Sequence, residues 1–375
     1  FKGAFEDVAA PELGAVAIKA AMSEANIDAS AVEQVVMGCV LPAGQGQAPA
    51  RQAALGADLP MAAEAVTVNK MCGSGMQAAI MAHDTIKAGS ADIIVAGGME
   101  NMSATPYILP KARAGFRMGH GEVKDSLFLD GLEDAETGGL MGLFGQSTAD
   151  QYGYSREAMD AFAMRSLSRA QTALKEGFFG HEISPVTIKT RKGELIIEED
   201  EQPKNANSEK IPLLKPAFKK DGTITAANAS SMADGAAALV LMNERHAQQK
   251  GCVPLARVVA QASHAQAPEE FCLAPVGAIK KVLEKANWSS EEVDLFEINE
   301  AFAVVTMLAI DQLNLDPEKV NVNGGACALG HPLGATGARI VVTLIHALRR
   351  LGKKRGVASL CIGGGEATAV AIELL

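Results

Sequence analysis

Aromatic residues are scarce in this sequence of 375 residues: Phe, Trp and Tyr together make up 4%, with a single Trp. Proteins that bind single-stranded nucleic acid stack bases on aromatic side chains, so this composition argues against that class. Basic residues are also in the minority, with 34 Lys and Arg against 44 Asp and Glu and a formal net charge of −10. We therefore expect no binding to nucleic acid or to an anionic membrane surface.

Long apolar runs and paired cysteines are missing too. The longest apolar runs, such as residues 301–310, fall short of the roughly 18 residues that span a bilayer. The six cysteines form no C-x-x-C pair and show no histidine spacing typical of zinc. We expect no bound metal and reduced thiols in a cytoplasmic compartment. Phe1 is not an initiator methionine, so we expect that residues ahead of it have been lost. Whether an N-terminal targeting segment preceded Phe1 stays open.

Motifs for nucleotide hydrolysis and for NAD binding are absent, because the sequence has no P-loop and no G-x-G-x-x-G turn between a strand and a helix. Glycine, by contrast, is abundant. Its 37 residues exceed the usual share of roughly 7%, and they cluster in loops where backbone can approach a ligand. The length allows two or more domains, and a hydrophobic content of 48% is ordinary for a globular protein.

Strands and helices alternate over the first hundred residues. The segment 91–98 shows no polar alternation, which is typical of a strand in a sheet covered on both faces. Apolar spacing predicts helices at 11–25, 49–56 and 76–87 and strands at 32–37, 66–70 and 91–98.

The middle of the chain has a different texture. Residues 107–124 are locally basic and rich in glycine, and either a solvated loop or an interaction surface explains them. Residues 155–176 are predicted to form an amphipathic helix, whereas 189–218 are polar and contain proline around a strand-like ELIIEE. We expect an insertion lying over a core.

The alternation resumes at residue 234, and the second half of the chain then repeats the first. The predicted elements are strands at 234–242, 293–298, 320–325 and 356–365 and helices at 275–286, 301–313 and 338–351. Three segments of the first half, 33–40, 67–78 and 91–102, correspond in order to 293–302, 320–338 and 356–369. Ligands in such α/β architectures bind at the carboxyl ends of strands, so loops from both halves are expected to converge on one cleft.

Cys72 lies between a predicted strand and a predicted helix. A helix N-terminus favours the thiolate, which is the nucleophilic form of cysteine. Gly73 and Gly75 carry no Cβ atom, so a substrate carbonyl has room to approach the sulfur. The alternative is a small buried core residue, because free cysteine is among the most buried residue types.

Three more reactive side chains follow predicted strands of the second half. Asn299 follows Ile298, His331 lies in GHPLG, and Cys361 begins CIGGG. Each alone has another explanation: Asn299 as a helix cap, His331 as a loop histidine and Cys361 as core packing. Together with Cys72, all four lie at strand ends beside Gly-rich backbone, which favours a shared site.

These motifs resemble those of the thiolase family over essentially the whole chain. The resemblance is carried by NKMCGSG (69–75), GGMENMS (97–103), NASSMADGAAA (228–238), NEAFA (299–303), NGGACALGHPLGATGAR (323–339) and CIGGGEA (361–367). It implies two duplicated βαβαβαββ halves that form a five-layered α-β-α-β-α core with an inserted loop domain. The first half would comprise residues 1–104 and 234–254, the insertion 105–233, and the second half 255–375.

The resemblance also implies roles for the reactive residues. Cys72 would take the acyl group, and His331 would stabilise its thiolate. Cys361 would act as acid and base, first toward the departing CoA thiolate and then toward the α-carbon of a second acetyl thioester. Asn299, through a water, and His331 would form one oxyanion hole, and the N–H groups of Cys72 and Gly363 would form another.

The substrates implied are coenzyme A thioesters: acetyl-CoA and acetoacetyl-CoA, with free CoA as product and no bound cofactor. Ser230 would touch the pantetheine and Met141 and Phe302 would wall it. The remaining contacts expected on this basis are Ala301, Phe271, Leu140 and, at the nucleotide end, Lys204. Family members assemble as homotetramers, dimers of dimers, through a segment that corresponds to 107–124.

Chain-length preference stays open, because GLMG (139–142) has Leu140 where short-chain members often carry histidine. The leading hypothesis is condensation of two acetyl-CoA molecules, with a degradative 3-ketoacyl-CoA thiolase as the alternative. A ketoacyl synthase lacks a second cysteine like Cys361. A non-catalytic carrier on the same fold is a further alternative, whereas a cysteine protease would need a third residue to orient His331.

Overall fold

The first of two similar sheets forms the N-terminal half of the protein. A computed structural model describes residues 1–191 and 193–375. The strands of this sheet have the spatial order β2-β1-β3-β8, with β1 parallel to both neighbours and β8 antiparallel to β3. They are β1 (Gln34–Gly38), β2 (Glu64–Val68), β3 (Ile93–Asn101) and β8 (Asp234–Met242).

The second sheet has the order β10-β11-β12-β9, which matches the first sheet when the two orders are shifted by one strand, and the isolated parallel bridge of Val320 to Phe296 takes the place of β2. Its strands are β9 (Ala256–Ala265), β10 (Leu295–Ile298), β11 (Arg355–Ile362) and β12 (Glu366–Leu374). β10 is parallel to β11, and β12 is antiparallel to both β11 and β9. β1, β3 and β8 therefore correspond to β10, β11 and β12, which is the internal duplication expected from the sequence.

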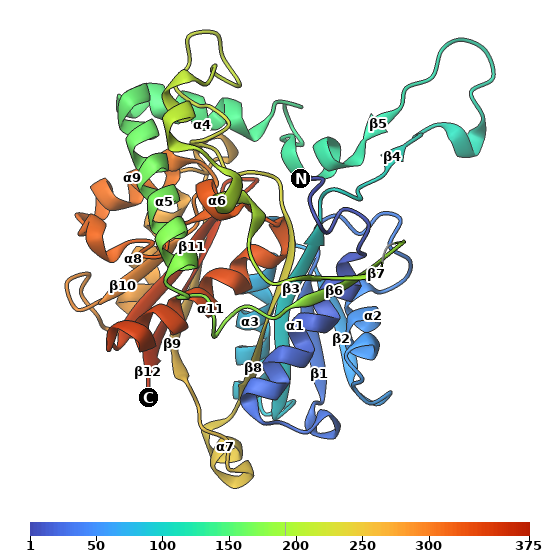
Figure 1. Cartoon of the computed structure of the whole chain (residues 1–375), viewed down its shortest axis with the longest axis vertical. Coiled ribbons are helices and arrows are strands. Elements are labelled where there is room, and N and C mark those ends of the chain that lie inside the picture. Colours follow the sequence, from blue (N-terminus) through green and yellow to red (C-terminus); the bar gives the residue numbers. More distant parts are fainter. Residues whose placement is uncertain (192) are drawn as a thin grey trace.

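Helices form three layers around and between the two sheets (Figure 1). α1 (Ala10–Ala25) and α2 (Pro49–Gly56) cover the outer face of the first sheet, and α8 (Ala274–Ala286) and α9 (Ala303–Leu313) cover that of the second. α3 (Ser74–Ala88) and α11 (Leu333–Leu351) lie between the sheets, where they pack against each other and against strands of both. The five-layered core is thus present, and the central helices bring the two halves together.

Burial on both faces explains the apolar character of the inner strands. Every residue of β3 is buried, and so is every residue of β11 after Arg355. The predicted helix after Cys72 ends at Gly89, which adopts φ +75° and caps α3 through its N–H group. Periodicity and end signals therefore predicted these elements to within a few residues.

The insertion forms small elements over the core. A two-stranded arm of β4 (Tyr107–Ile108) and β5 (Lys124–Asp125) extends away from the molecule, while α4 (Met141–Tyr152) and α5 (Arg156–Lys175) lie over the C-terminal half (Figure 1). The remaining elements are a π-helical turn (Phe128–Leu132), β6 (Val186–Thr190), β7 (Gly193–Ile197), α6 (Glu201–Asn205), α7 (Glu244–Lys250), α10 (Ala326–Leu329) and 3₁₀ turns at Ala29–Ala31, Ala112–Ala114, Ser208–Leu213, Pro268–Glu270 and Pro317–Lys319.

Two predicted elements are wrong. Residues 320–325 do not form a strand: Val320 makes an isolated parallel bridge to Phe296, and α10 follows at Ala326. The last long helix begins at Leu333 instead of 338, because the glycines at 334 and 337 pack tightly against other backbone. Within the described ranges no helix is long and apolar enough to cross a membrane.

A cavity of about 690 Å³ lies along β8, between α1, α3 and α11. In the described part of the chain β8 pairs with a strand on one side only. The residues described as lining this cavity do not include Cys72, Asn299 or Cys361. The candidate site therefore lies elsewhere, at the carboxyl ends of the parallel strands.

Candidate active site

Cys72 lies in a tight turn that ends immediately before α3. Met71 has φ +46°, and its N–H group donates to the side-chain oxygen of Asn69. The Ser74 hydroxyl accepts the N–H of Lys70 at 2.9 Å and donates to the carbonyl of Met71 at 2.6 Å. The sequence therefore fixes this turn through local side-chain bonds, and the sulfur is held at the start of the helix.

The thiol of Cys72 is protonated at rest, contrary to the expected thiolate. Burial raises its pKa to about 11, although N–H groups of Gly363 and of Cys72 itself bond the sulfur and lower the pKa. The carboxylate of Glu100 raises it further. Burial therefore outweighs the helix N-terminus at this sulfur.

Cys361 reaches the same place from the other half. It lies at the end of β11 and is 1% exposed. Burial raises the pKa of its thiol well above the usual range, and Cys72 raises it further, because the two sulfurs lie close enough for their charges to interact. A Cβ atom added to Gly73 would lie 2.4 Å from the Cδ1 atom of Ile362. The two cysteine-bearing turns are thus in contact.

The CIGGG segment turns sharply after Cys361. Gly364 and Gly365 have φ values of +89° and +85°, a region that side-chain-bearing residues rarely adopt. This turn lets the chain reverse into β12 and leaves the Gly363 N–H directed at the sulfur of Cys72. Both N–H groups expected to form an oxyanion hole therefore point at one sulfur.

His331 precedes α11, and tight backbone packing brings this helix against α3. A Cβ atom on Gly75 would lie 2.8 Å from the backbone nitrogen of Ala338 and 2.9 Å from the carbonyl oxygen of Gly334. Leu333, at the start of α11, packs in one apolar cluster with Cys72. The N-termini of the two central helices therefore lie side by side, with Cys72 before one and His331 before the other.

The hydrogen bonds of Thr336 define the tautomer of His331. The Thr336 hydroxyl donates to the carbonyl of Pro332 at 2.9 Å, so its oxygen accepts a proton from Nδ1 of His331, 2.6 Å away. Nε2 is then unprotonated, and it is buried without a hydrogen-bond partner in the described part of the protein. Burial, and then Arg339, lower the pKa of His331 to about 3, so the imidazole is neutral. Nε2 is therefore an unprotonated ring nitrogen whose lone pair has no partner among the described residues.

Asn299 also presents unused polar atoms. It follows β10, and its N–H group donates to the carbonyl of Ser359, two residues before Cys361. Its side chain is 1% exposed, and neither the oxygen nor the nitrogen of the amide has a partner among the described residues. A buried amide without partners is costly unless a ligand or water completes it.

The neighbouring residue, Glu300, holds this loop in place. Its carboxylate accepts the hydroxyl of Ser166 at 2.7 Å, the side-chain amide of Asn321 at 2.8 Å and the N–H of Cys327 at 3.1 Å. These bonds tie the loop after β10 to α5 and to the segment before α11. Asn299 is thereby fixed while its own amide stays available.

Comparison with known proteins agrees with this geometry. The family model for the thiolase N-terminal domain matches residues 1–245, and that for the thiolase C-terminal domain matches residues 252–374. The chain belongs to the thiolase family.

Individual thiolases are similar over their full length. The acetyl-CoA acetyltransferases of Cupriavidus necator and Escherichia coli are each 48% identical to this chain, with 100% of it aligned to 95% and 96% of those proteins. The solved acetyl-CoA acetyltransferase of Bacillus anthracis superimposes with a TM-score of 0.97 at 42% identity, covering 100% of this chain and 95% of that one. A thiolase of Ascaris suum in complex with coenzyme A gives 0.94 at 43%, with coverage of 100% and 96%.

An aromatic and methionine wall of this thiolase lies beside Gly363. A Cβ atom on Gly363 would lie 3.9 Å from the sulfur of Met141, the first residue of α4. Phe302 makes edge-to-face contacts with Phe218 and Phe271, at centroid distances of 6.1 and 6.2 Å. The predicted pair Met141 and Phe302 is therefore near the site, while Phe271 is 2% exposed and supports Phe302.

The loop that carries Ser230 is tied to the loop that carries Phe302. The Ser230 N–H donates to the carbonyl of Ala301, and the Ala303 N–H donates to the carbonyl of Asn228, at 2.9 and 2.8 Å. Three of the predicted contacts, Ser230, Ala301 and Phe302, are thus brought together.

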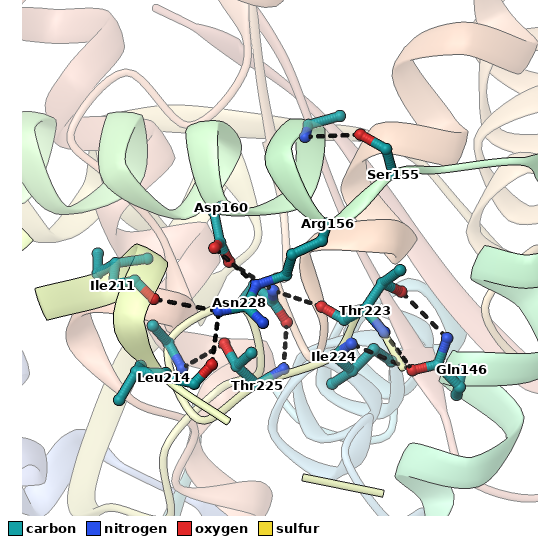
Figure 2. A network of polar contacts seen from close by, with 12 residues as sticks. Gln146, Ser155, Arg156, Asp160, Ile211, Leu214, Thr223, Ile224, Thr225 and Asn228 are labelled. Atoms are coloured by element: carbon teal, nitrogen blue, oxygen red, sulfur yellow. Dashed lines mark hydrogen bonds and ion pairs between the residues drawn. The ribbon is translucent and has the colours of Figure 1, made fainter. Parts of the chain in front are cut away.

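A polar network shapes the segment before Ser230 (Figure 2). Asn228 donates its side-chain amide to Asp160 and to the carbonyl of Thr223, and its side-chain oxygen accepts the N–H of Thr225. Arg156 pairs with Asp160 at 2.7 Å. Because α5 supplies Arg156 and Asp160, the inserted domain sets the shape of this wall.

The remaining two predictions are placed differently. Leu140 is the residue immediately before α4 and is next to Met141 in the chain. Lys204 is on α6, where its ammonium pairs with Glu199 at 2.6 Å on the surface, and α6 packs against α5 and α10. The contacts described for Lys204 do not link it with the wall.

Sequence reasoning missed two polar residues of this region. Thr336 lies five residues after His331. At this spacing in the first turn of a helix, the Thr336 hydroxyl reaches back to the turn that contains His331. Glu100 is the penultimate residue of β3, which is apolar from Ile93 to Met99, and it is 0% exposed. A charged residue at the end of a fully buried strand is the signal that marks it.

Proposed function

We propose that this thiolase condenses two acetyl-CoA molecules into acetoacetyl-CoA and CoA, reversibly and through an acetyl group carried on Cys72. The observation that carries the proposal is the meeting of two thiols, Cys72 and Cys361, from opposite halves. His331 precedes the helix that packs against the start of α3, Asn299 is bonded to the strand that carries Cys361, and both side chains have unused polar atoms. The acetyl-CoA acetyltransferases that resemble the whole chain support the choice of substrate.

In the first half-reaction, the sulfur of Cys72 attacks the thioester carbonyl while its proton passes to Nε2 of His331. The N–H groups of Cys72 and Gly363, which already point at this sulfur, stabilise the oxyanion. The bond from the acyl carbon to the CoA sulfur breaks, and the departing thiolate takes the proton of Cys361. Acetyl-Cys72, protonated His331 and the Cys361 thiolate remain.

In the second half-reaction, the Cys361 thiolate removes a proton from the α-carbon of a second acetyl-CoA. The Asn299 amide and the Nε2–H group that His331 now carries stabilise the enolate oxygen. The α-carbon attacks acetyl-Cys72, and the Cys72 thiolate leaves and recovers its proton from His331. The Cys72 proton has returned from His331, while the original proton of Cys361 has left on CoA and the α-proton of the second acetyl-CoA has replaced it.

The different environments of the two thiols suit these roles. A base works best on a weak carbon acid when its own conjugate acid is weak, and burial makes Cys361 such a group. Asn299 and His331 contribute two buried polar groups that lack partners among the described residues, and the enolate is the anion that both would bind.

The alternative is a degradative thiolase that cleaves longer 3-ketoacyl-CoA substrates. Leu140, Met141 and Phe302 are the predicted wall residues that would meet a longer acyl chain. A series of 3-ketoacyl-CoA substrates from four to sixteen carbons tests the choice. We expect kcat/KM to be highest for acetoacetyl-CoA, and a preference for the long chains would overturn it.

We also propose that residues 107–124 pair two dimers into a homotetramer. The arm of β4 and β5 exposes apolar side chains, among them Tyr107 at 68%, Val123 at 61% and Met118 at 95%. Light scattering of a variant with residues 109–122 replaced by a short Gly-Ser linker tests this. A tetramer that persists would remove the arm from the interface.

The division into residues 1–104 with 234–254, 105–233 and 255–375 is part of the same proposal, supported by the matched sheets. So is a cytoplasmic location, supported by the six cysteines, each of which is a free thiol in the structure. The nucleotide end of CoA is proposed to reach Lys204.

A further inference from the structure

A buried glutamate joins the segments that carry the reactive residues. Glu100, at the end of β3, accepts three backbone N–H groups. Its Oε2 atom accepts those of Val40 at 2.9 Å and Gly334 at 2.8 Å, and its Oε1 atom accepts that of Leu41 at 3.1 Å. Val40 and Leu41 belong to the loop after β1, whereas Gly334 belongs to α11 of the other half. One carboxylate thus links both halves.

Glycines from three N-terminal elements bring α11 this close. A Cβ atom would lie 1.9 Å from the carbonyl oxygen of Gly334 if added to Gly98, and 2.6 Å if added to Gly38. Gly75 makes the third such approach, at 2.9 Å. No larger residue fits these positions without moving the helix, so the start of α11 is seated directly on the N-terminal half.

The contact of Gly334 with the N-terminal half lies close in the chain to both the proposed nucleophile and its base. Gly334 is three residues after His331, and Gly75 is three residues after Cys72. The negative charge of Glu100 also acts on the sulfur of Cys72. A carboxylate at the N-terminus of α11 is favoured by the helix dipole as well as by its hydrogen bonds.

We propose that Glu100 is a positioning residue that fastens the start of α11 to the N-terminal half and thereby sets His331 against Cys72. The Gly334 N–H group joins α11 to the carboxylate that also holds Val40 and Leu41, and the close glycine contacts oppose sliding of α11 along α3. The inference rests on the acyl transfer proposed above, and it assigns a role to a motif, GGMENMS, that the reaction itself does not use.

Other titratable groups near Cys72 belong to β11, β12, the segment before α11 and the turn that contains Cys72 itself. Cys361 faces it from β11, and neutral His331 precedes α11. Lys70, in the same turn, pairs with Glu366 of β12, so its charge is compensated. Glu100 is the carboxylate whose charge acts on the sulfur of Cys72, and burial raises the pKa of Glu100 itself to about 6.

The test uses two substitutions that disturb the contact between Glu100 and Gly334, one on each side of it. Glu100→Gln replaces one of the two accepting oxygens by an NH₂ group, which cannot accept the backbone N–H groups that this oxygen accepted. Gly334→Ala adds a Cβ atom at 2.8 Å from Oε2 of Glu100. We expect kcat to fall by about 10-fold or more in each, with the KM for acetyl-CoA within about twofold, because positioning and not binding is lost.

Glu297→Gln is the matched control. Glu297 is a buried glutamate of β10, 2% exposed, and one of its oxygens has no partner in the described ranges. We expect this variant to keep kcat within about twofold, since replacing a buried carboxyl by an amide should not by itself lower kcat. Loss of activity equal to that of Glu100→Gln would overturn the proposal.

Alkylation of Cys72 by iodoacetamide, followed by peptide mass mapping from pH 6 to 11, does not depend on catalysis. Removing the charge of Glu100 is expected to move the alkylation curve of Cys72 to lower pH by about half a unit or more. Gly334→Ala keeps the charge and is not expected to move the curve this way.

The outcomes separate the two proposals. An unchanged curve together with unchanged kcat in Glu100→Gln would refute the role of Glu100. Failure of acetyl-CoA to acetylate Cys72 in the unmodified protein would instead refute the proposed function, while the alkylation curves would still report on Glu100. If Glu100→Gln does not fold, Gly334→Ala alone decides through its kcat and KM.

Discussion

Cys72 and Cys361 are the same residue type, one from each of two similar halves, yet they follow strands that do not correspond, and their surroundings differ. Cys72 retains some accessible surface and has two N–H groups on its sulfur. Cys361 is buried at the end of β11, and two other thiols act on it. The first environment suits a sulfur that becomes a carbonyl-bearing thioester, and the second suits a sulfur that exchanges protons.

The difference arises from the turns that follow the two strands. After β2 the chain enters α3 at once, so Cys72 lies at a helix N-terminus. After β11 three glycines reverse the chain into β12, so Cys361 stays within the sheet while Gly363 points back at Cys72. Each half thus supplies one thiol, and local turn chemistry gives each its role.

Cys72→Ser is expected to have the largest effect. A hydroxyl is a poorer nucleophile and a poorer leaving group than a thiol, so kcat should fall by about 10⁴-fold or more. Exchange of labelled CoA into acetyl-CoA should disappear together with condensation. Exchange that persists near the normal rate would show that the acyl group is carried elsewhere.

Cys361→Ala is expected to separate the two half-reactions. Condensation should fall by about 10²- to 10⁴-fold because the base for the α-proton is gone. Acetylation of Cys72 should continue at a reduced rate, since only the proton donor to CoA is missing. Normal condensation by this variant would remove Cys361 from the mechanism and erase the contrast between the thiols.

Asn299→Asp tests the enolate site that the two thiols share. A carboxylate in place of the amide repels the enolate, so condensation should fall by about 10²- to 10³-fold while acetylation of Cys72 changes far less. The rate of Cys72 acetylation, from samples quenched in acid, and the steady-state rate of condensation are measured on the same preparation. Equal losses in both would place Asn299 on the Cys72 side.

Thr336→Val tests the tautomer of His331. Without the hydroxyl that accepts from Nδ1, the imidazole loses its fixed proton position, and the rate of Cys72 acetylation should fall by about 10-fold. Thr368→Val is the control, because the buried Thr368 hydroxyl has no partner in the described part of the chain. That variant should keep full activity, and a matching loss there would point to packing instead.

The smallest expected effect concerns reactivity toward iodoacetamide. Because the pKa of Cys72 is about 11, its alkylation rate should rise continuously from pH 7 to beyond pH 10, and Cys361 should react more slowly at each pH. Peptide mapping of each cysteine measures both. A plateau for Cys72 below pH 8 would mean a stable thiolate and would contradict the neutral pair with His331.

Elements with complete local signals were predictable. α3 follows from apolar spacing and the glycine at 89, and the face of α5 that contains Met159 and Phe162 is buried as its periodicity predicts. β9 and the isolated bridge at Val320 were not predicted correctly. β9 carries Arg257, Gln261 and His264 along an edge, and pairing with β12 defines it, which no local pattern records.

The site divides in the same way. Strand ends and Gly-rich loops predicted which side chains meet, because that depends on topology. The protonation state of Cys72 was not predictable, since β11 and α11 bury it from 260 or more positions away in the sequence. Glu100 was missed for a similar reason, because its partners at 40, 41 and 334 come from two other elements.

Location of the acetyl group tests the central claim most directly. The unmodified protein is mixed with acetyl-CoA, quenched in acid within the first turnover, digested and mapped by mass. The account predicts one acetyl group on the peptide that contains Cys72 and none on the peptide that contains Cys361. An acetyl group on Cys361, or none on either, would contradict it.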